Sequence, residues 1–148
     1  MELRVNNCKP DAIACIHGEK GSALHGTVRF WKTGEGVMIE AEICGLPQSQ
    51  TGFFALHIHE GTSCCGEGFS DTGGHYNPEG KSHPNHAGDL PPLMCVCGRA
   101  YMQVLTGRFT LREVIGKTVV IHSGPDDFHT QPAGNAGTKI GCGVICSR

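Results

Sequence analysis

The sequence lacks the features that mark several large classes of proteins. Its 148 residues contain no apolar run of the 18 or so residues that a membrane-spanning helix requires. The 12 Lys and Arg residues are scattered rather than clustered, and the formal net charge is -2, so no basic stripe for nucleic acid is present. We therefore expect neither a membrane nor a nucleic acid as a partner.

The sequence also lacks internal repeats, low-complexity tracts and linker-like boundaries. A chain of this length is of the usual size for one domain and can bury a hydrophobic core. Residues 1–7 have no apolar stretch of the kind found in a signal peptide, which favours a cytoplasmic protein, while a secreted or cell-envelope location stays open if the chain is a mature form. We predict one domain over residues 1–148.

The apolar residues follow the pattern of an all-β protein. Short apolar or alternating runs are separated by turns rich in Gly, Pro and Ser, and no long amphipathic helix appears. About eight strands are predicted, a number typical of a sandwich or barrel. They cover Ala12 to Ile16, Gly26 to Trp31, Gly36 to Ile43, Phe53 to His59, Leu93 to Val96, Ala100 to Thr106, Thr118 to His122 and Cys142 to Ile145. Leu111 to Ile115 could form a helical turn or a strand.

Two polar segments, Glu60 to Asp89 and Ser123 to Ile140, are too long for tight hairpins. A long loop without regular structure in a compact domain usually carries function. We therefore expect the functional site to lie in or beside these two loops.

Six of the nine histidines fall between His57 and His122. His57 and His59 alternate along an apolar run, so both imidazoles point to one face of a strand. A His-x-His pair alone is more often structural, but the long loop after it carries three more histidines and a carboxylate that together span fifteen positions. These four residues match a four-coordinate zinc site: His75, His83, His86 and Asp89.

A second ligand set is made only of nitrogen donors. It comprises His57, His59, His75 and His122. An all-imidazole set suits copper, whereas the set that contains Asp89 suits zinc, so one histidine must serve both metals. Metal-bound imidazoles usually donate their second N–H to a carboxylate, and we assign that role to Asp126, four residues after His122.

Eight ordered segments between His25 and Ile145 make the chain resemble the copper-zinc superoxide dismutases. They are His25-Gly26-Thr27-Val28-Arg29-Phe30, Leu56-His57-Ile58-His59-Glu60, Gly74-His75-Tyr76-Asn77-Pro78, His86-Ala87-Gly88-Asp89-Leu90, Val119-Val120-Ile121-His122, Asp126-Asp127, Gly134-Asn135-Ala136-Gly137 and Cys142-Gly143-Val144-Ile145. The resemblance implies an eight-stranded Greek-key β-sandwich, or flattened barrel, an architecture for which this enzyme is a standard example.

The resemblance also implies ligands and chemistry. Copper would bind His57, His59, His75 and His122, and zinc would bind His75, His83, His86 and Asp89. His75 would be a bridging imidazolate that releases copper, takes up a proton and returns it to the nascent peroxide. One superoxide would reduce Cu(II) and leave as oxygen, and a second would reoxidise Cu(I) and leave as hydrogen peroxide.

The resemblance gives a role to two of the nine cysteines. Its intrasubunit disulfide would join Cys64, with the adjacent Cys65 as the alternative, to Cys142. No role carries over to six others: Cys8, Cys15, Cys44, Cys95, Cys97 and Cys146. The odd number leaves at least one thiol unpaired, and a chain this long with so many cysteines fits an intracellular protein better than a disulfide-rich secreted one.

Two departures from the family pattern bear on function. Lys139 stands where the family has an arginine near copper, and lysine keeps the charge but loses the planar fork. We expect Lys139 to attract superoxide but to orient it less well. Only two residues separate His83 from His86, so the zinc loop is short.

The predicted function is dismutation of superoxide, and two other classes stay open. A copper- or zinc-binding protein of the same fold would bind metals with little or no turnover. A sandwich with structural zinc alone would serve as an interaction module. A homodimer also stays open, because exposed strands do not reveal which face pairs with another subunit.

Overall fold

A computed structural model describes residues 9–148 of the chain, so Cys8 lies outside the described residues. The elements are β1 (Ala12–Gly18), β2 (His25–Lys32), β3 (Val37–Cys44), β4 (Phe53–Phe54), β5 (Leu56–His59), the 3-10 helix η1 (Glu67–Thr72), β6 (Leu93–Val96), β7 (Arg99–Thr106), α1 (Leu111–Val114), β8 (Thr118–His122) and β9 (Lys139–Ser147). Among these residues no helix is long and apolar enough to cross a membrane. The all-β prediction is confirmed.

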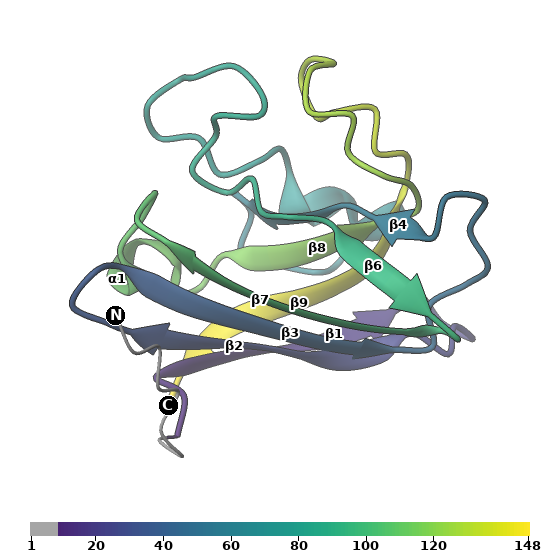
Figure 1. The fold of residues 1–148 in the computed structure, drawn as a ribbon, viewed down its shortest axis with the longest axis horizontal. Coiled ribbons are helices and arrows are strands. Elements are labelled where there is room, and N and C mark those ends of the chain that lie inside the picture. The colour runs from purple at the N-terminus through teal and green to yellow at the C-terminus, as the bar shows by residue number, and fades with distance from the viewer. Residues whose placement is uncertain (1–8) are drawn as a thin grey trace.

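All strand pairs are antiparallel, and the sheet closes almost completely on itself. The strand order is β4-β6-β7-β3-β2-β1-β9-β8-β5. The two edge strands are thus β4 and β5, although only Ala55 separates them in sequence. The two edges of the sheet therefore meet at Ala55, and a barrel results (Figure 1).

Ala55 also explains why nine strands replace the predicted eight. The predicted strand Phe53 to His59 is divided, because the Ala55 amide donates to the Gly124 carbonyl and the Ala55 carbonyl accepts from the His122 amide. Ahead of Ala55 the chain pairs with β6, and after it the chain pairs with β8. One continuous apolar run thus serves both edges of the sheet.

The barrel interior is filled by alternate residues of the long strands. On β1 the buried residues are Ala12, Ala14 and Ile16, and on β2 they include Val28 and Phe30, none of them more than 3% exposed. Burying a side chain as large as Phe30 contributes about 1.5–3 kcal/mol. Alternation of this kind fixes the strand register, because a shift by one residue would turn the apolar side chains outward.

The two long loops emerge from the same side of the barrel. Figure 1 shows the segment after β5, in teal, and the segment after β8, in yellow-green, rising together away from strands β1 to β3. The first loop contains η1, and Leu111–Val114 forms a single helical turn, one of the two alternatives that the sequence allowed. The loops therefore lie together beside β5 and β8.

Candidate metal centre

Strand pairing brings the predicted metal-binding residues together beside β5. His57 and His59 point to the same side of this strand, and both are buried because the loops cover them. Isolated β-bridges join His57 to Asp89 and His59 to His75. His122 ends β8, the strand that pairs with β5.

The first group of side chains consists of the four residues predicted for copper, His57, His59, His75 and His122, whose ligand atoms lie within 4.8 Å of one another. His59 Nε2 lies 3.2 Å from His122 Nε2. The Nδ1 atoms of these two rings contact the carbonyl oxygens of Gly73, at 2.8 Å, and Gly137, at 3.3 Å. Because a carbonyl can only accept, each Nδ1 carries the hydrogen, and the two Nε2 atoms of the neutral rings face each other with lone pairs.

The second group consists of the four residues predicted for zinc, His75, His83, His86 and Asp89, with ligand atoms again within 4.8 Å of one another. The Asp89 carboxylate lies 2.7 Å from His75 Nδ1 and 3.1 Å from His83 Nδ1. His86 Nδ1 lies 3.2 Å from His75 Nδ1. Three imidazoles and a carboxylate thus converge, which is a donor set that four-coordinate zinc accepts.

His75 belongs to both groups. Its Nδ1 faces Asp89 and His86, whereas its Nε2 is buried and has no hydrogen-bond partner among residues 9–148. The centroid of its ring lies 4.0 Å from that of His57 and 4.9 Å from that of His59. The two nitrogens of one ring are therefore available to two different centres.

Asp126 links the two groups through their outer nitrogens. Its Oδ2 lies 2.8 Å from His57 Nε2, and its Oδ1 lies 2.8 Å from His83 Nε2. A carboxylate only accepts, so both Nε2 atoms carry hydrogens, and the Nδ1 atoms of both rings are left as lone pairs. One side chain thus fixes the tautomer of a histidine in each group.

The protonation states also suit metal binding. Burial lowers the pKa of His59 to about 2 and that of His122 to about 3, and burial is likewise the main reason why the pKa of His57 is lowered. Burial alone would raise the carboxyl pKa of Asp126, but its hydrogen bonds from His57 and His83 outweigh burial and lower it. Neutral imidazoles and ionised carboxylates are the forms that coordinate metals.

Unpartnered nitrogens provide a test of whether cations fit this site. Within the described residues, three buried ring nitrogens have no hydrogen-bond partner: His57 Nδ1, His75 Nε2 and His83 Nδ1. A buried polar atom without a partner destabilises a protein by about 1–3 kcal/mol. All three point into the two groups, where a cation would satisfy them, so the residues present fit metal ions.

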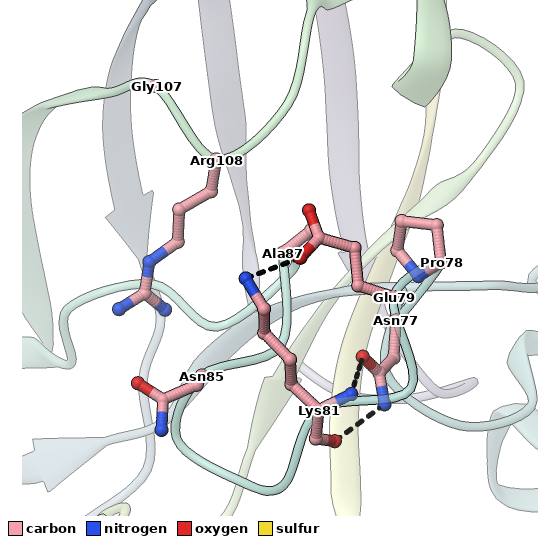
Figure 2. Close-up of a pocket in the computed structure, with 8 residues that line it drawn as sticks. All are labelled: Asn77, Pro78, Glu79, Lys81, Asn85, Ala87, Gly107 and Arg108. Carbon is pink, nitrogen blue, oxygen red and sulfur yellow. Dashed lines mark hydrogen bonds and ion pairs between the residues drawn. The ribbon is translucent and has the colours of Figure 1, made fainter.

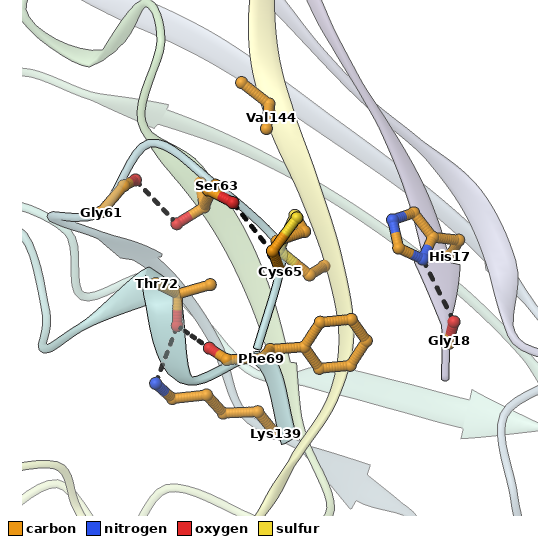
Figure 3. Close-up of a disulfide and its surroundings, with 12 residues drawn as sticks. His17, Gly18, Gly61, Ser63, Cys65, Phe69, Thr72, Lys139 and Val144 are labelled. Carbon is orange, nitrogen blue, oxygen red and sulfur yellow. Dashed lines mark hydrogen bonds between the residues drawn. A yellow bond between two sulfur atoms is a disulfide. The ribbon is translucent and has the colours of Figure 1, made fainter. Parts of the chain in front are cut away.

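Lys139, the first residue of β9, lies beside the first group. Its Nζ donates to Thr72 Oγ1 at 2.7 Å (Figure 3). It also donates to the Gly73 carbonyl at 2.9 Å. The same Gly73 carbonyl accepts from His59 Nδ1. Burial lowers the pKa of Lys139. The ammonium group is thus held by the loop that also orients a histidine.

A disulfide joins Cys64 in the first loop to Cys142 in β9, across 78 residues of sequence, as the resemblance implied (Figure 3). Cys142 is fully buried and packs with Phe69 and Val120 in a small apolar cluster outside the barrel. The loop is therefore fixed to the sheet by a covalent bond and by apolar contacts. The other described cysteines are free: Cys15, Cys44, Cys65, Cys95, Cys97 and Cys146.

Sequence reasoning missed the contacts made by main-chain atoms and by ordinary polar side chains. The carbonyls of Gly73 and Gly137 and the hydroxyl of Thr72 were not predicted to take part, nor was the side chain of Gln131, which bonds to the main chain of His83. A carbonyl leaves no signal in the residue type that bears it. Only the folded loop geometry reveals these partners.

Comparisons with known proteins agree on one family. Residues 24–145 match the family described as Copper/zinc superoxide dismutase (SODC). The Cu-Zn superoxide dismutase 2 of Aquifex aeolicus is 40% identical over 135 residues, which cover 81% of this chain and 78% of that protein. The Cu-Zn superoxide dismutase of Caulobacter vibrioides is 32% identical over 137 residues, which cover 81% of this chain and 77% of that protein.

Solved structures give the same likeness in three dimensions. A SOD-like protein from Bacillus subtilis matches with a TM-score of 0.76 and 28% identity, over 89% of this chain and 96% of that chain. A double mutant of a SOD-like protein from the same organism, with two residues replaced by histidine, matches with a TM-score of 0.78 and 27% identity, over 91% and 97% of the two chains.

Proposed function

The chain belongs to the copper/zinc superoxide dismutase family, and we propose that it converts superoxide to oxygen and hydrogen peroxide at the centre formed by the two histidine groups. It is an oxidoreductase that uses copper and zinc. In this proposal copper binds His57, His59, His75 and His122, and zinc binds His75, His83, His86 and Asp89. Copper held by these residues would supply the one-electron redox chemistry that the conversion of superoxide needs.

The contact between His59 Nε2 and His122 Nε2 carries the proposal. Two lone pairs at 3.2 Å in a buried site repel each other unless a proton or a cation lies between them. Burial disfavours the proton, since the pKa values of both rings are lowered to about 2 and 3. A metal ion bound by nitrogen is therefore the partner that these two rings require.

His75 is the residue that we assign to proton transfer. Its Nδ1 is held on the side of Asp89 and His86, so the ring keeps its orientation when Nε2 changes partner. A free Nε2 on the side of His57 and His59 can hold a proton and deliver it to the peroxide product. A general acid in this position must lie within hydrogen-bond reach of the product, and of the two nitrogens of His75 only Nε2 is free to do so.

Lys139 is the residue that we assign to attracting the substrate. Its ammonium group lies beside the first group, and its bonds to Thr72 and Gly73 restrict its position. A positive charge near the site raises the arrival rate of an anion, an effect for which superoxide dismutase is a standard example. Because lysine lacks the fork of arginine, it guides the anion without a two-point contact.

The experiment that tests this function uses protein loaded with one copper and one zinc per chain, with free copper excluded. We expect superoxide consumption near the diffusion limit, about 10⁸–10⁹ M⁻¹s⁻¹, that slows as salt is added. A rate equal to that of the metal-free protein would mean that the chain binds metals without turnover.

The bridging role of His75 is tested by His75→Ala, with the exposed His129→Ala as the matched control. We expect the His75 variant to lose both metals at equilibrium dialysis, because one ring supplies a nitrogen to each centre. The control should retain both. If only one metal is lost, His75 belongs to a single centre and the bridge is wrong.

A further inference from the structure

Two side chains from outside the zinc loop hold the main chain of residues 83–89. We propose that Gln131 and Arg108 are positioning residues for zinc, which act through the backbone that carries His83, His86 and Asp89. The inference rests on the proposed zinc ligands and adds two residues that contact no metal.

Gln131, in the loop after β8, pairs with the main chain of His83 through both ends of its amide. Its Oε1 accepts from the His83 amide at 2.9 Å, and its Nε2 donates to the His83 carbonyl at 2.8 Å. This pairing reproduces the two hydrogen bonds that a neighbouring β-strand would make. The backbone of His83 is therefore fixed in position and in rotation about its own axis.

Arg108, between β7 and α1, holds the same segment from the other side. Its Nη1 donates to the carbonyls of Pro84, at 2.9 Å, and His86, at 3.2 Å, and lies 3.5 Å from that of Asp89. A guanidinium nitrogen carries two hydrogens, so the first two contacts are hydrogen bonds and the third is weak. Figure 2 shows the side chain reaching down toward the loop that carries Asn85.

The side-chain contacts of the proposed zinc ligands do not fix the position of this main chain. The end of the segment is tied to β5, because the Ile58 amide donates to the Gly88 carbonyl. Asp126 fixes the ring of His83, and the His86 amide donates to Asp89 Oδ2 at 3.0 Å, but neither contact holds the main chain of residues 83–86 to the rest of the protein. Gln131 and Arg108 hold that part of the main chain. Tetrahedral zinc tolerates little error in the direction of its ligands. A main chain at His83 without these hydrogen bonds would therefore weaken zinc binding, whereas the nitrogens of His59 and His122 would stay in place.

Solvent limits the size of the effect. Surface cavities of about 370 Å³ and 380 Å³ flank Arg108, so water can replace part of what its guanidinium supplies. Removing an outer partner of a metal ligand weakens metal binding by about 10–100-fold, and for these exposed side chains we expect the lower end, about tenfold for each.

The test compares two variants with two matched controls. Gln131→Met and Arg108→Met remove the hydrogen bonds and keep similar length, while Gln103→Met and Arg112→Met make the same changes at exposed side chains that have no hydrogen bond within the described residues. Zinc release to a chromogenic chelator is measured on protein that holds both metals. Co²⁺ is then placed in the zinc site, where its visible absorption reports the coordination geometry.

We expect zinc release about tenfold faster in each of the two variants, with altered Co²⁺ bands, and unchanged release and bands in the controls. A general loss of stability would lower the urea midpoint of the metal-free protein and leave the Co²⁺ bands unchanged, which would overturn the inference. Release equal to that of the controls would also overturn it.

His83→Ala separates this inference from the proposed function. If this variant keeps the four-coordinate Co²⁺ bands, the zinc ligand assignment itself is wrong. If it loses them while the Gln131 and Arg108 variants match their controls, the ligands stand and only the positioning role fails.

Discussion

The barrel and its two long loops are held together by different kinds of interaction. In the barrel, side chains such as Phe30 and Ile39 are fully buried, and antiparallel pairing runs without a break along β1, β2 and β3. In the loops, the fixed points are a disulfide, a set of buried histidines and hydrogen bonds to single carbonyls. Many small contributions stabilise the barrel, whereas a few specific links stabilise the loops.

This difference determines where the protein is sensitive to single substitutions. A barrel residue shares its contribution with many neighbours, and the surrounding core partly adapts to its loss. A loop link such as Asp126 has no substitute among its neighbours, because it joins two histidines by two defined hydrogen bonds. Changes that touch the links should therefore alter the site and leave the barrel intact.

The largest expected effect comes from the covalent link between the two regions. In the metal-free protein, Cys64→Ala with Cys142→Ala should lower the free energy of unfolding by about 2–4 kcal/mol, because the bond constrains the unfolded chain across 78 residues. The measurement is urea unfolding. Cys15→Ala with Cys146→Ala, two exposed free thiols, is the control and should change little. Equal losses in both pairs would show that the loop is not held by the bond.

The next effect concerns the hydrogen bonds that join the two histidine groups. Asp126→Asn keeps the size of the side chain but cannot accept hydrogens at both ends, so it should weaken the retention of both metals by about 10–100-fold. Competition with chelators of known affinity measures this loss. The urea midpoint of the metal-free barrel should stay near its starting value. The exposed Asp71→Asn, in η1, serves as control, and equal retention in both variants would contradict the role of Asp126.

The smallest effect is a pH dependence of the metal-free protein between pH 7.5 and 6. The folded-state pKa values of His59 and His122 are about 2 and 3, below the ordinary 6.5, because both rings are buried. The unfolded chain therefore binds more protons, so stability is fully present above pH 6.5 and decreases as the pH falls. The loss should be at most about 1 kcal/mol for each histidine by pH 6.

Urea midpoints at the two pH values measure this loss. The lowered carboxyl pKa values of Asp89 and Asp126 act only below pH 4 and do not contribute in this range. All buried histidines and aspartates among residues 9–148 lie in the site. A urea midpoint that is higher at pH 6 than at pH 7.5 would therefore contradict the assignment of the pH response to the buried histidines.

The barrel and the loops could be predicted from the sequence to different degrees. Apolar alternation placed the strands within a few residues, since Leu93–Val96 and Thr118–His122 were predicted with their observed ends. It could not show the break at Ala55, which depends on pairing with a distant loop. The residues that converge in the two histidine groups were predicted from their types and spacing, because few residue types coordinate copper and zinc. The roles of Gln131 and Arg108 could not be predicted, since both bond to main-chain atoms whose positions only the fold determines.

The zinc loop also covers a backbone edge of the sheet. On the side of β5 that faces away from β8, the Ile58 amide donates to the Gly88 carbonyl, and the Ile58 carbonyl accepts from the Tyr76 amide. A strand edge without such cover can pair with a strand of another molecule. We expect loss of zinc to free residues 76–88 and so to expose this edge. Zinc bound at the proposed site would thus also protect the protein against aggregation.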